Sequence, residues 1–244
     1  MTGNGWFQLG LYVAVLLLLA KPLGGYMARV YQGEPVFLDR LFRPIERLIY
    51  GVLRVSPEAE MGWKTYALAM LLFNAFGFLA VYGIQRLQGL LPLNPQQFGA
   101  ASPDLSFNTA VSFITNTNWQ SYGGESTMSY LTQMSALAVQ NFLSAATGMA
   151  VLVAMIRGFS RHSTQTIGNF WVDLTRSTLY ILLPLSVVLA LALVSQGVVQ
   201  TFEPYHTVSL LQAVGPDTAR VTTQSIPLGP AASQVSRNSA MRCR

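Results

Sequence analysis

Four long stretches of the sequence are mostly apolar and contain no charged residue. They cover residues 1–20, 65–85, 126–156 and 177–202. A helix needs about 20 mostly apolar residues to cross a bilayer, and each stretch is long enough. Because an open strand edge cannot satisfy its hydrogen bonds in lipid, the pattern predicts four membrane-spanning α-helices. The first stretch lacks the basic start and the cleavage site of a signal peptide, so a span is the favoured interpretation.

A shorter apolar segment, residues 105–114, is followed by uncharged polar residues as far as Gly124. Ten residues correspond to about half a membrane crossing. The segment is preceded by Ser102, Pro103 and Asp104, which together are typical of a helix start. A half-helix that enters the membrane, followed by a polar strand that returns, is a re-entrant pore loop. The alternative is a polar outer loop packed on the protein surface.

Lysine and arginine are unevenly distributed between these stretches. Residues 21–64 contain seven and residues 157–176 contain three, whereas residues 87–125 contain none and residues 203–234 contain one. Positively charged loops remain on the cytoplasmic side. The pattern therefore predicts an N-terminus outside the cell, and places both flanks of the predicted pore loop on the outer side.

Composition supports a membrane protein. The chain is 51% hydrophobic and only 10% charged, whereas soluble domains carry about 25% charged residues. Disorder would require low hydrophobicity and many charges, and a single cysteine, Cys243, excludes a disulfide scaffold. The net charge of +5 follows the predicted topology. No clustered basic face of the kind that binds nucleic acid is evident, so a nucleic-acid partner is not expected. We predict an all-α membrane protein in the lipid bilayer.

The segment between the first two stretches has a pattern of its own. Residues 36–55 space their apolar positions like a surface helix, interrupted by Pro44 and, further on, Pro57. An amphipathic helix at the cytoplasmic membrane interface is the favoured interpretation. A docking surface for a soluble partner is the alternative.

The chemistry of the predicted pore loop favours a monovalent cation. Backbone carbonyls in such a loop can replace the hydration shell of an ion, and the preceding half-helix directs its partially negative C-terminal end toward the membrane centre. Threonine and asparagine side chains add neutral oxygens, and no carboxylate lies between Leu105 and Gly124. A charged ring suited to divalent ions is therefore not offered.

Several strings of residues point to one family. They are residues 91–97, 108–113, 115–122, 140–146, 171–174 and 229–234. In these strings the chain resembles the potassium-transporting ATPase A subunits, the KdpA family. The likeness extends from the N-terminus to Gln234, and the string at residues 115–122 is its most specific part.

The resemblance implies a K⁺-channel-like fold in which helix, pore loop and helix repeat four times in one chain. It implies K⁺ binding in the filter by Thr115, Asn116, Thr117, Asn118, Trp119 and Gln120. K⁺ would be the transported ion, and no organic cofactor is expected.

The resemblance also implies a pump in the bacterial inner membrane with three further subunits, which the family letters B, C and F. They are a P-type ATPase, a single-pass protein and a small protein, respectively. ATP hydrolysis would belong to the P-type ATPase, and this chain contains no Walker loop and no aspartyl-phosphate motif. We therefore expect no catalytic residue in this chain.

On this basis the chain divides into five regions. These are an extra N-terminal transmembrane helix (1–30), an interfacial segment (31–64), the first helix–pore-loop–helix unit (65–157), the start of a second unit (158–202), and an outer segment with a tail (203–244). The resemblance stops at Gln234, and residues 235–244 are polar, basic and unlike the family. This end is expected of a truncated or frame-shifted product that lacks three filter loops.

The filter also lacks the glycine run of potassium channels. Asn116 and Asn118 are expected to take left-handed backbone angles in its place, because asparagine tolerates them better than most residues. Two other functions stay open. The chain could be a non-transporting assembly protein or non-functional fragment. A secondary transporter is the other alternative, although no ionisable residue lies inside the four predicted spans, where such a protein would place them.

Overall fold

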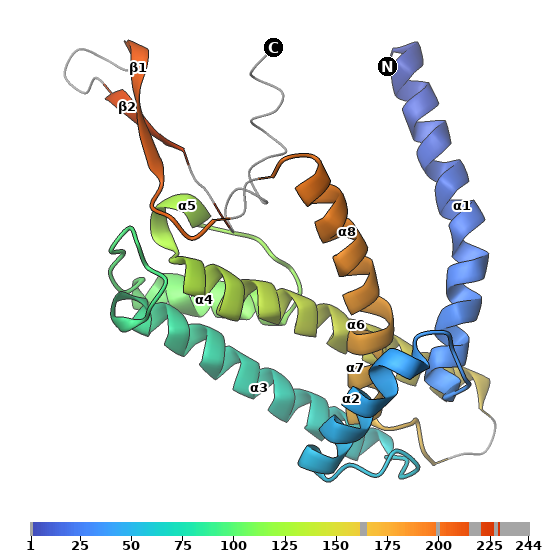
Figure 1. Ribbon diagram of the computed structural model, residues 1–244. Helices are drawn as coiled ribbons and strands as arrows, with labels where there is room; N and C mark the ends of the chain where they lie inside the picture. Colours follow the sequence, from blue (N-terminus) through green and yellow to red (C-terminus); the bar gives the residue numbers. More distant parts are fainter. Residues whose placement is uncertain (1, 162–164, 199–200, 215–220, 227–228, 230–244) are drawn as a thin grey trace. The chain divides into compact units, whose positions relative to one another are not determined.

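The computed structural model describes residues 2–161, 165–198, 201–214, 221–226 and 229, and these are mostly helical (Figure 1). The helical elements are α1 (Gly3–Gln32), α2 (Asp39–Leu53), α3 (Trp63–Leu87), the 3₁₀ turn η1 (Gln88–Leu90), α4 (Pro103–Ile114), α5 (Gly124–Thr127), the π-helical segment η2 (Thr132–Ala138), α6 (Val139–Ser160), α7 (Phe170–Arg176), the π-helical segment η3 (Ser177–Leu182) and α8 (Leu183–Ser195). Two strands follow, β1 (His206–Val214) and β2 (Val221–Ile226).

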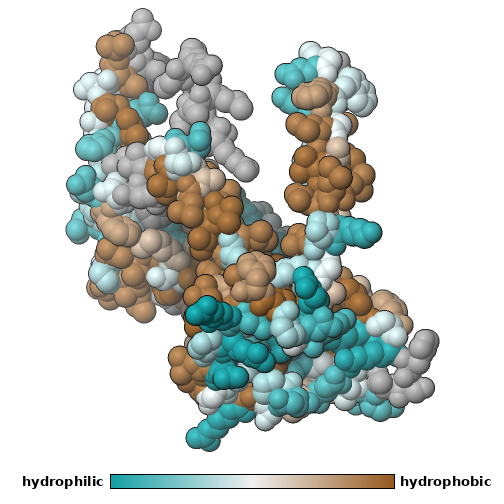
Figure 2. All heavy atoms as spheres, turned by 45° about the vertical axis from the view of Figure 1, so that its right-hand side comes forward, coloured by the Kyte–Doolittle hydropathy of each residue, from teal (hydrophilic) through white to brown (hydrophobic). Residues whose placement is uncertain are grey.

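Four helical runs are long and apolar enough to cross a membrane: Gly3–Gln32, Trp63–Leu90, Thr132–Ser160 and Phe170–Ser195. The prediction of four membrane-spanning helices is confirmed in number. On the face shown in Figure 2, α1 is covered by apolar side chains, and its hydrophobic stretch is fully exposed. Such a surface needs lipid or another apolar partner to cover it.

The helices are longer than the charge-free stretches that predicted them. α1 passes through Pro22 and continues to Gln32, and the fourth run begins at Phe170 rather than at Ser177. Asp173 and Arg176 therefore lie inside a helix, and the prediction that no ionisable residue lies inside the spans is wrong for these bounds. Asp173 and Arg176 lie in the first and last turns of α7, whereas Lys21 lies in the interior of α1. The sequence alone showed these charges only as boundaries of the apolar stretches.

The chain forms two compact units. The first contains residues 1–66 and 149–184, and the second contains residues 67–148 and 185–244. The first unit holds α1, α2, the C-terminal part of α6, α7 and η3. The second holds most of α3, then α4, α5, η2 and the two strands. Each unit has its own hydrophobic core.

The core of the first unit packs α2 against η3 and the end of α1. Phe42, Glu46 and Tyr50 recur every four residues and form the buried face of α2, and the rings of Phe42 and Tyr180 meet edge to face at 5.7 Å. This spacing is that of an amphipathic helix, as predicted for residues 36–55. Whether α2 also lies at the membrane interface remains a prediction.

A buried ion pair joins α6 and α7 in the first unit. The guanidinium of Arg157 donates to both oxygens of Asp173, over 2.6 and 2.9 Å, and the hydroxyl of Tyr66 donates to the same carboxylate at 3.1 Å. The Asp173 side chain is only 1% exposed. At Gly168, where φ is +109°, a Cβ atom would collide with the Arg157 guanidinium. A glycine is therefore needed for the ion pair to close.

A second carboxylate is buried nearby in the same unit. Glu46 accepts hydrogen bonds from Tyr50 (2.7 Å), Tyr180 (2.9 Å) and Arg176 (3.1 Å). The backbone carbonyl of Tyr31 accepts from both Arg157 and Arg176, at 3.4 Å each. The two ion pairs thus share one peptide group at the end of α1, and they connect four helices.

Pro184 leaves a carbonyl in the helix without its usual donor. Proline has no N–H, so the carbonyl four residues earlier, that of Tyr180, loses its partner in the helix. The hydroxyl of Tyr26 donates to this carbonyl at 2.8 Å. A side chain from α1 therefore completes the hydrogen bonding of the fourth helical run and ties the two together.

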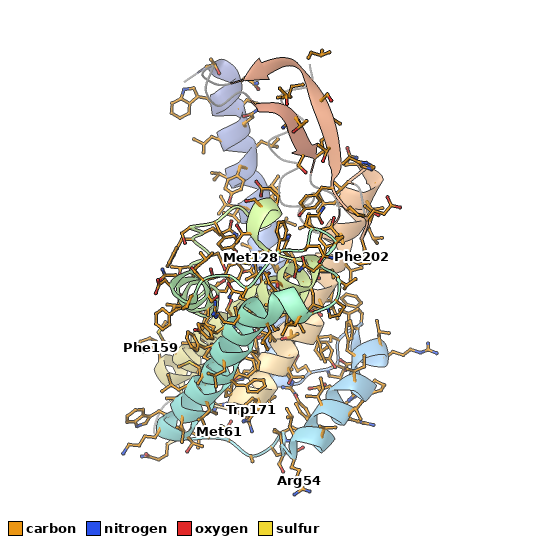
Figure 3. All side chains as sticks on the ribbon, turned by 90° about the vertical axis from the view of Figure 1, so that its left-hand side faces the viewer. Arg54, Met61, Met128, Phe159, Trp171 and Phe202 are labelled. Atoms are coloured by element: carbon orange, nitrogen blue, oxygen red, sulfur yellow. The ribbon has the colours of Figure 1, made fainter. Side chains whose placement is uncertain are left out.

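Two segments that precede helices pair with each other at the edge of the first unit. The N–H of Met61 donates to the carbonyl of Gly168 at 2.7 Å, and the N–H of Ile167 donates back to the carbonyl of Met61 at 3.0 Å. Figure 3 shows Met61 and Trp171 near the N-terminal end of α3. This pairing holds the loop that carries Gly168.

The second unit packs α3, α4 and η2 around a core of Val81, Ala110, Phe113, Met128 and Leu137. Met128, labelled in Figure 3, is fully buried. α3 and α6 approach closely at Gly77, where an added Cβ would lie 2.6 Å from the side-chain oxygen of Gln140. Because Gly77 has no side chain, the side chain of Gln140 fits between α3 and α6.

A β-hairpin, which the all-α prediction lacked, follows the last helix. β1 and β2 are antiparallel, with His206 opposite Ile226 and an irregularity between Ser209 and Val214. The alternation of polar and apolar residues from Thr207 to Leu210 is typical of a strand. The predicted tail at residues 235–244 lies outside the described residues.

Candidate functional site

The half-helix predicted before the candidate filter is present as α4. The Ser102 hydroxyl accepts a hydrogen bond from the N–H of Leu105 at 3.3 Å, Pro103 opens the helix, and Asp104 lies in its first turn. Twelve residues make the helix roughly 18 Å long at 1.5 Å per residue. A bilayer core is about 30 Å thick, so this helix cannot cross it.

The buried face of α4 fixes the position of its C-terminal end. Ser106, Thr109, Ala110, Ser112 and Phe113 are all buried, and Phe113 belongs to the core of the second unit. The chain leaves the helix after Ile114, so residues 115–120 start from a point that packing holds in place.

The backbone of residues 115–120 takes the unusual shape that the two asparagines predicted. Asn116 and Asn118 both have φ of 56°, the left-handed region that most non-glycine residues avoid. The Asn118 amide donates to the Asn116 side-chain oxygen at 3.0 Å. The same oxygen accepts from Ser144 of α6 at 3.4 Å. The expectation of left-handed asparagines is confirmed, and a contact to α6 is added.

The donors of this loop turn back toward α4. The N–H groups of Thr115 and Thr117 donate to the carbonyls of Val111 and Ser112, each at 3.0 Å, and the N–H of Asn118 donates to Ser112 at 3.3 Å. Among the carbonyls of residues 115–120, the described part of the chain gives a hydrogen bond only to that of Trp119, from the Ser112 hydroxyl at 2.8 Å. The remaining carbonyl oxygens keep their lone pairs.

The hydroxyl groups of Thr115 and Thr117 also donate to carbonyls of α4. Thr115 donates to the carbonyl of Val111 at 2.9 Å, and Thr117 donates to that of Ser112 at 3.3 Å. The two hydroxyl oxygens also contact each other. A hydroxyl has one proton and two lone pairs. Once the proton is used inside the protein, only acceptor capacity faces outward.

Ser112 organises the loop, and the sequence analysis did not single it out. Its carbonyl accepts from Thr117 and Asn118, and its hydroxyl holds Trp119. The signal for this role was a serine in an otherwise apolar run, less than one helical turn before the polar loop. A serine in that position was equally compatible with a helix contact.

All six predicted filter residues are brought together on one exposed surface. Residues 115–120 are exposed, and the Trp119 side chain is 47% exposed. No carboxylate lies between Leu105 and Gly124. The C-terminal end of α4 carries partial negative charge. The loop therefore combines free neutral oxygens with a weakly negative potential, which suits a cation without a fixed counter-charge.

Two glutamines of the second unit, Gln133 and Gln140, are buried. The amide of Gln133 donates to the carbonyls of Gly124 and Met128, at 3.2 and 2.8 Å, and holds the segment before η2. Gln140 is 3% exposed, and its nitrogen has no hydrogen-bond partner in the described part of the chain. Gln133 therefore makes structural hydrogen bonds, whereas the side-chain nitrogen of Gln140 stays unpaired among the described residues.

Comparison with known proteins gives a consistent result. The family described as "Potassium-transporting ATPase A subunit" (KdpA) matches residues 10–238, which extends four residues beyond the predicted end of the likeness at Gln234. A protein of Herpetosiphon aurantiacus and one of Sorangium cellulosum are each 61% identical to the chain over 236 residues. A protein of Methylococcus capsulatus is 57% identical over 256 residues. All three are described as "Potassium-transporting ATPase potassium-binding subunit".

The matches cover most of this chain but less than half of each relative. The matches include 96% of this chain but only 41% of the first two relatives and 43% of the third. The chain thus spans about two fifths of the length of the relatives it matches. The family match covers nearly the whole chain, including α4 and the loop that follows it, and the chain belongs to the KdpA family of potassium-transporting ATPase A subunits.

Proposed function

We propose that this chain carries the first K⁺-binding filter loop of an ATP-driven potassium uptake pump, and that residues 115–120 form one wall of the filter. The observation that carries the proposal concerns the hydrogen-bonding groups of the loop: its donors are used within the protein, whereas most of its acceptors are free. The N–H groups of residues 115–118 and the threonine hydroxyls donate back to α4, whereas most carbonyl oxygens of the loop accept nothing. Such a surface binds a cation and repels an anion.

K⁺ is the cation that this arrangement fits best. Filters for K⁺ use neutral carbonyl oxygens in place of the hydration shell, whereas divalent cations are usually bound with carboxylates. The loop offers the first and lacks the second. The relatives are described as potassium-binding subunits, which supports the same ion.

The re-entrant course of residues 103–124 is part of this proposal. α4 is too short to cross a bilayer, and non-helical backbone at membrane depth survives only where it lines water or is buried in protein. The uneven distribution of lysine and arginine supports an N-terminus outside the cell. We therefore place residues 87–125 on the outer side of a bacterial inner membrane and residues 21–64 in the cytoplasm.

Cysteine labelling tests this topology. In a variant that lacks Cys243, a cysteine at position 96 should react with an impermeant maleimide added to intact cells, and one at position 47 should not. Outside labelling at position 47 would overturn the assignment.

The partners of the proposed pump are a P-type ATPase that hydrolyses ATP, a single-pass protein and a small protein, the family's subunits lettered B, C and F. The division of labour is supported by the name of the relatives, which describes a binding subunit of an ATPase. In this proposal the chain contributes no catalytic residue.

A chimera tests whether this chain can do the work of the binding subunit. The match with the Herpetosiphon aurantiacus relative covers 236 residues, which is 41% of that protein. The matched part of this chain should replace its counterpart there, expressed with the relative's own partner subunits in cells lacking other K⁺ uptake systems. Growth at low K⁺ is the expected result. A chimera that assembles in the membrane but does not take up K⁺ would contradict the proposal.

The isolated chain should not conduct K⁺. One filter loop supplies one wall of a cage that needs about four, as the exposure of residues 115–120 illustrates. The chain should therefore give no K⁺ flux in liposomes with a K⁺ gradient and a potential-sensitive dye. Saturable flux selective over Na⁺ would support a self-sufficient channel instead, and would contradict the requirement for further loops.

A further inference from the structure

The first unit contains a large cavity that plays no part in the proposed ion binding. Its volume is about 940 Å³, and it is lined by residues of α1, α2, α6 and α7 and of the loops between α2 and α3 and between α6 and α7. Pockets that hold small molecules commonly have about 300–1,000 Å³. The cavity is thus large enough for a ligand.

The lining changes from apolar to polar in the same direction along two helices. On α1, Met27 and Ala28 line the cavity before Gln32, and on α6 Ile156 lines it before Ser160. In both helices the polar residue lies at the C-terminal end. On the face shown in Figure 2, apolar side chains cover α1, and hydrophilic side chains gather around its C-terminal end and α2. The cavity therefore has an apolar wall and a charged floor.

The floor carries four arginines, Arg43, Arg157, Arg161 and Arg176, and three carboxylates, those of Glu58, Glu60 and Asp173. Two further carboxylates lie beside these arginines without lining the cavity, Asp39 at 3.9 Å from Arg43 and Glu46 at 3.1 Å from Arg176. The floor therefore has mixed charge, and an anion would depend on the arginines that keep free N–H donors.

The four arginines differ in how many of their N–H donors are already used in hydrogen bonds. Arg157 donates four hydrogen bonds, to Asp173, Ile167 and Tyr31, and Arg176 donates two, to Glu46 and Tyr31. Within the described residues, Arg161 donates through a single nitrogen to Glu60. The Arg43 side chain is 57% exposed, and its nearest carboxylate, that of Asp39, is 3.9 Å away. Because a guanidinium has five N–H donors, Arg43 and Arg161 keep donors for a phosphate as far as the described residues show.

We propose that this cavity binds one anionic phospholipid, with its phosphodiester on Arg43 and Arg161 and an acyl chain along the apolar wall of α1 and α6. Basic pockets between membrane helices bind anionic headgroups. The apolar wall favours a lipid over a free phosphate, because a free phosphate has no acyl chain to contact this wall. The site is independent of the filter loop and of the proposed transport.

Lipid binding to the full chain in detergent micelles tests the proposal. Native mass spectrometry should compare phosphatidylglycerol with phosphatidylcholine of the same acyl chains. We expect phosphatidylglycerol to bind about tenfold more tightly. Equal binding of the two lipids would overturn the proposal, because a headgroup site must distinguish them.

Two charge-matched double variants locate the site. Arg43→Gln with Arg161→Gln should remove most of the preference for phosphatidylglycerol, and it leaves both buried ion pairs intact. Arg40→Gln with Arg47→Gln removes the same charge from exposed positions that do not line the cavity, and should change the preference less than twofold. An equal loss in both variants would indicate general surface attraction and would refute the site.

A third variant tests the apolar wall. Ala28→Trp should fill part of the cavity, and should lower phosphatidylglycerol binding about fivefold while all four arginines remain. Soluble glycerophosphate should compete poorly with the lipid. Strong competition, or full lipid binding by Ala28→Trp, would show that the floor takes a free phosphate and would overturn the lipid assignment.

Discussion

In the unit of residues 1–66 and 149–184, the buried carboxylates of Glu46 and Asp173 each have an arginine and at least one tyrosine hydroxyl as partners. In the unit of residues 67–148 and 185–244, the described residues include no ion pair, and buried polar atoms of Asn74, Gln85, Ser106 and Gln140 have no hydrogen-bond partner. The first unit completes its polar contacts within itself.

The buried polar side chains of the second unit are all uncharged among the described residues, and some of them lack a hydrogen-bond partner. A charged, fully paired region behaves as a rigid anchor, because any change must break several strong bonds. A neutral region with free acceptors can exchange one partner for another at low cost. In the function that we propose, the first unit would serve as a scaffold and the second would contribute to the ion path.

The largest expected effect is on stability in the first unit. Asp173→Ala leaves Arg157 charged with its side chain only 16% exposed, and loss of one partner of a buried pair costs about 3–5 kcal/mol. Denaturant unfolding of the chain in detergent should show this loss. The double variant Asp173→Leu with Arg157→Met should recover most of it, because no charge is left buried. A loss below about 1 kcal/mol in the single variant would mean that water reaches Arg157 freely.

The next effect is on ion binding in the second unit. Gln120→Arg, placed in the chimera described above, puts a fixed positive charge beside the proposed filter. At 4 Å and an effective dielectric near 20, two unit charges repel by about 4 kcal/mol. The half-saturating K⁺ concentration for uptake should rise at least tenfold, which corresponds to about 1.4 kcal/mol.

Gln97→Arg is the matched control for this variant, since Gln97 is exposed on the predicted outer loop. It should leave the half-saturating concentration nearly unchanged. An unaltered concentration in Gln120→Arg would place Gln120 away from the ion path.

A smaller effect on the free energy of unfolding distinguishes buried polar groups without a hydrogen-bond partner from paired ones. Gln140→Leu removes an amide whose nitrogen has no partner in the described part of the chain and keeps about the same volume beside Gly77. Removing an unsatisfied group is nearly neutral, so the free energy of unfolding should change by less than about 1 kcal/mol. A loss of about 3 kcal/mol would show that Gln140 is paired after all, and would weaken the contrast between the units.

The smallest effect is on the pH dependence of the exposed pair in the first unit. The hydrogen bond from Thr166, followed by Arg161, holds the pKa of Glu60 below its usual range. A carboxylate with a lowered pKa stabilises the fold above its unfolded pKa of about 4.3, and this stabilisation is lost as the pH falls through the folded pKa. An exposed pair contributes at most about 1 kcal/mol.

Thermal unfolding of the chain and of Glu60→Gln measures this effect. The difference in Tm should be small at pH 7 and should vanish as the pH falls below about 4. Glu58→Gln serves as the control, because it removes a neighbouring carboxylate from the same loop. A difference that grows on acidification would contradict the direction of the pKa shift.

Features set by neighbouring residues could be predicted from the sequence. The apolar stretches gave the number of long helices, and Ser102, Pro103 and Asp104 gave the start of α4. The left-handed angles at Asn116 and Asn118 follow from a property of asparagine itself. In each case the deciding interaction lies within a few residues along the chain.

Features that depend on distant partners were missed. Asp173 and Arg176 marked the end of a loop in the sequence, yet their partners Arg157 and Glu46 lie 16 and 130 residues away and bring them into a helix. The hydrogen bond from Tyr26 to Tyr180 crosses 154 residues. No local pattern of charge or hydropathy contains such pairs.

The position of Ser112 has a consequence for engineering the loop. Its carbonyl belongs to the last turn of α4 and accepts hydrogen bonds from donors of the loop. If the loop is the filter that we propose, the helix backbone thereby determines the sign of the ion that it would accept. The side chains of Thr115, Asn116, Thr117 and Asn118 hold the shape of the loop, so Trp119 and Gln120 are the positions left to adjust the size of the ion. A library that varies these two side chains while keeping α4 intact should therefore yield filters for different alkali cations, and none for halides.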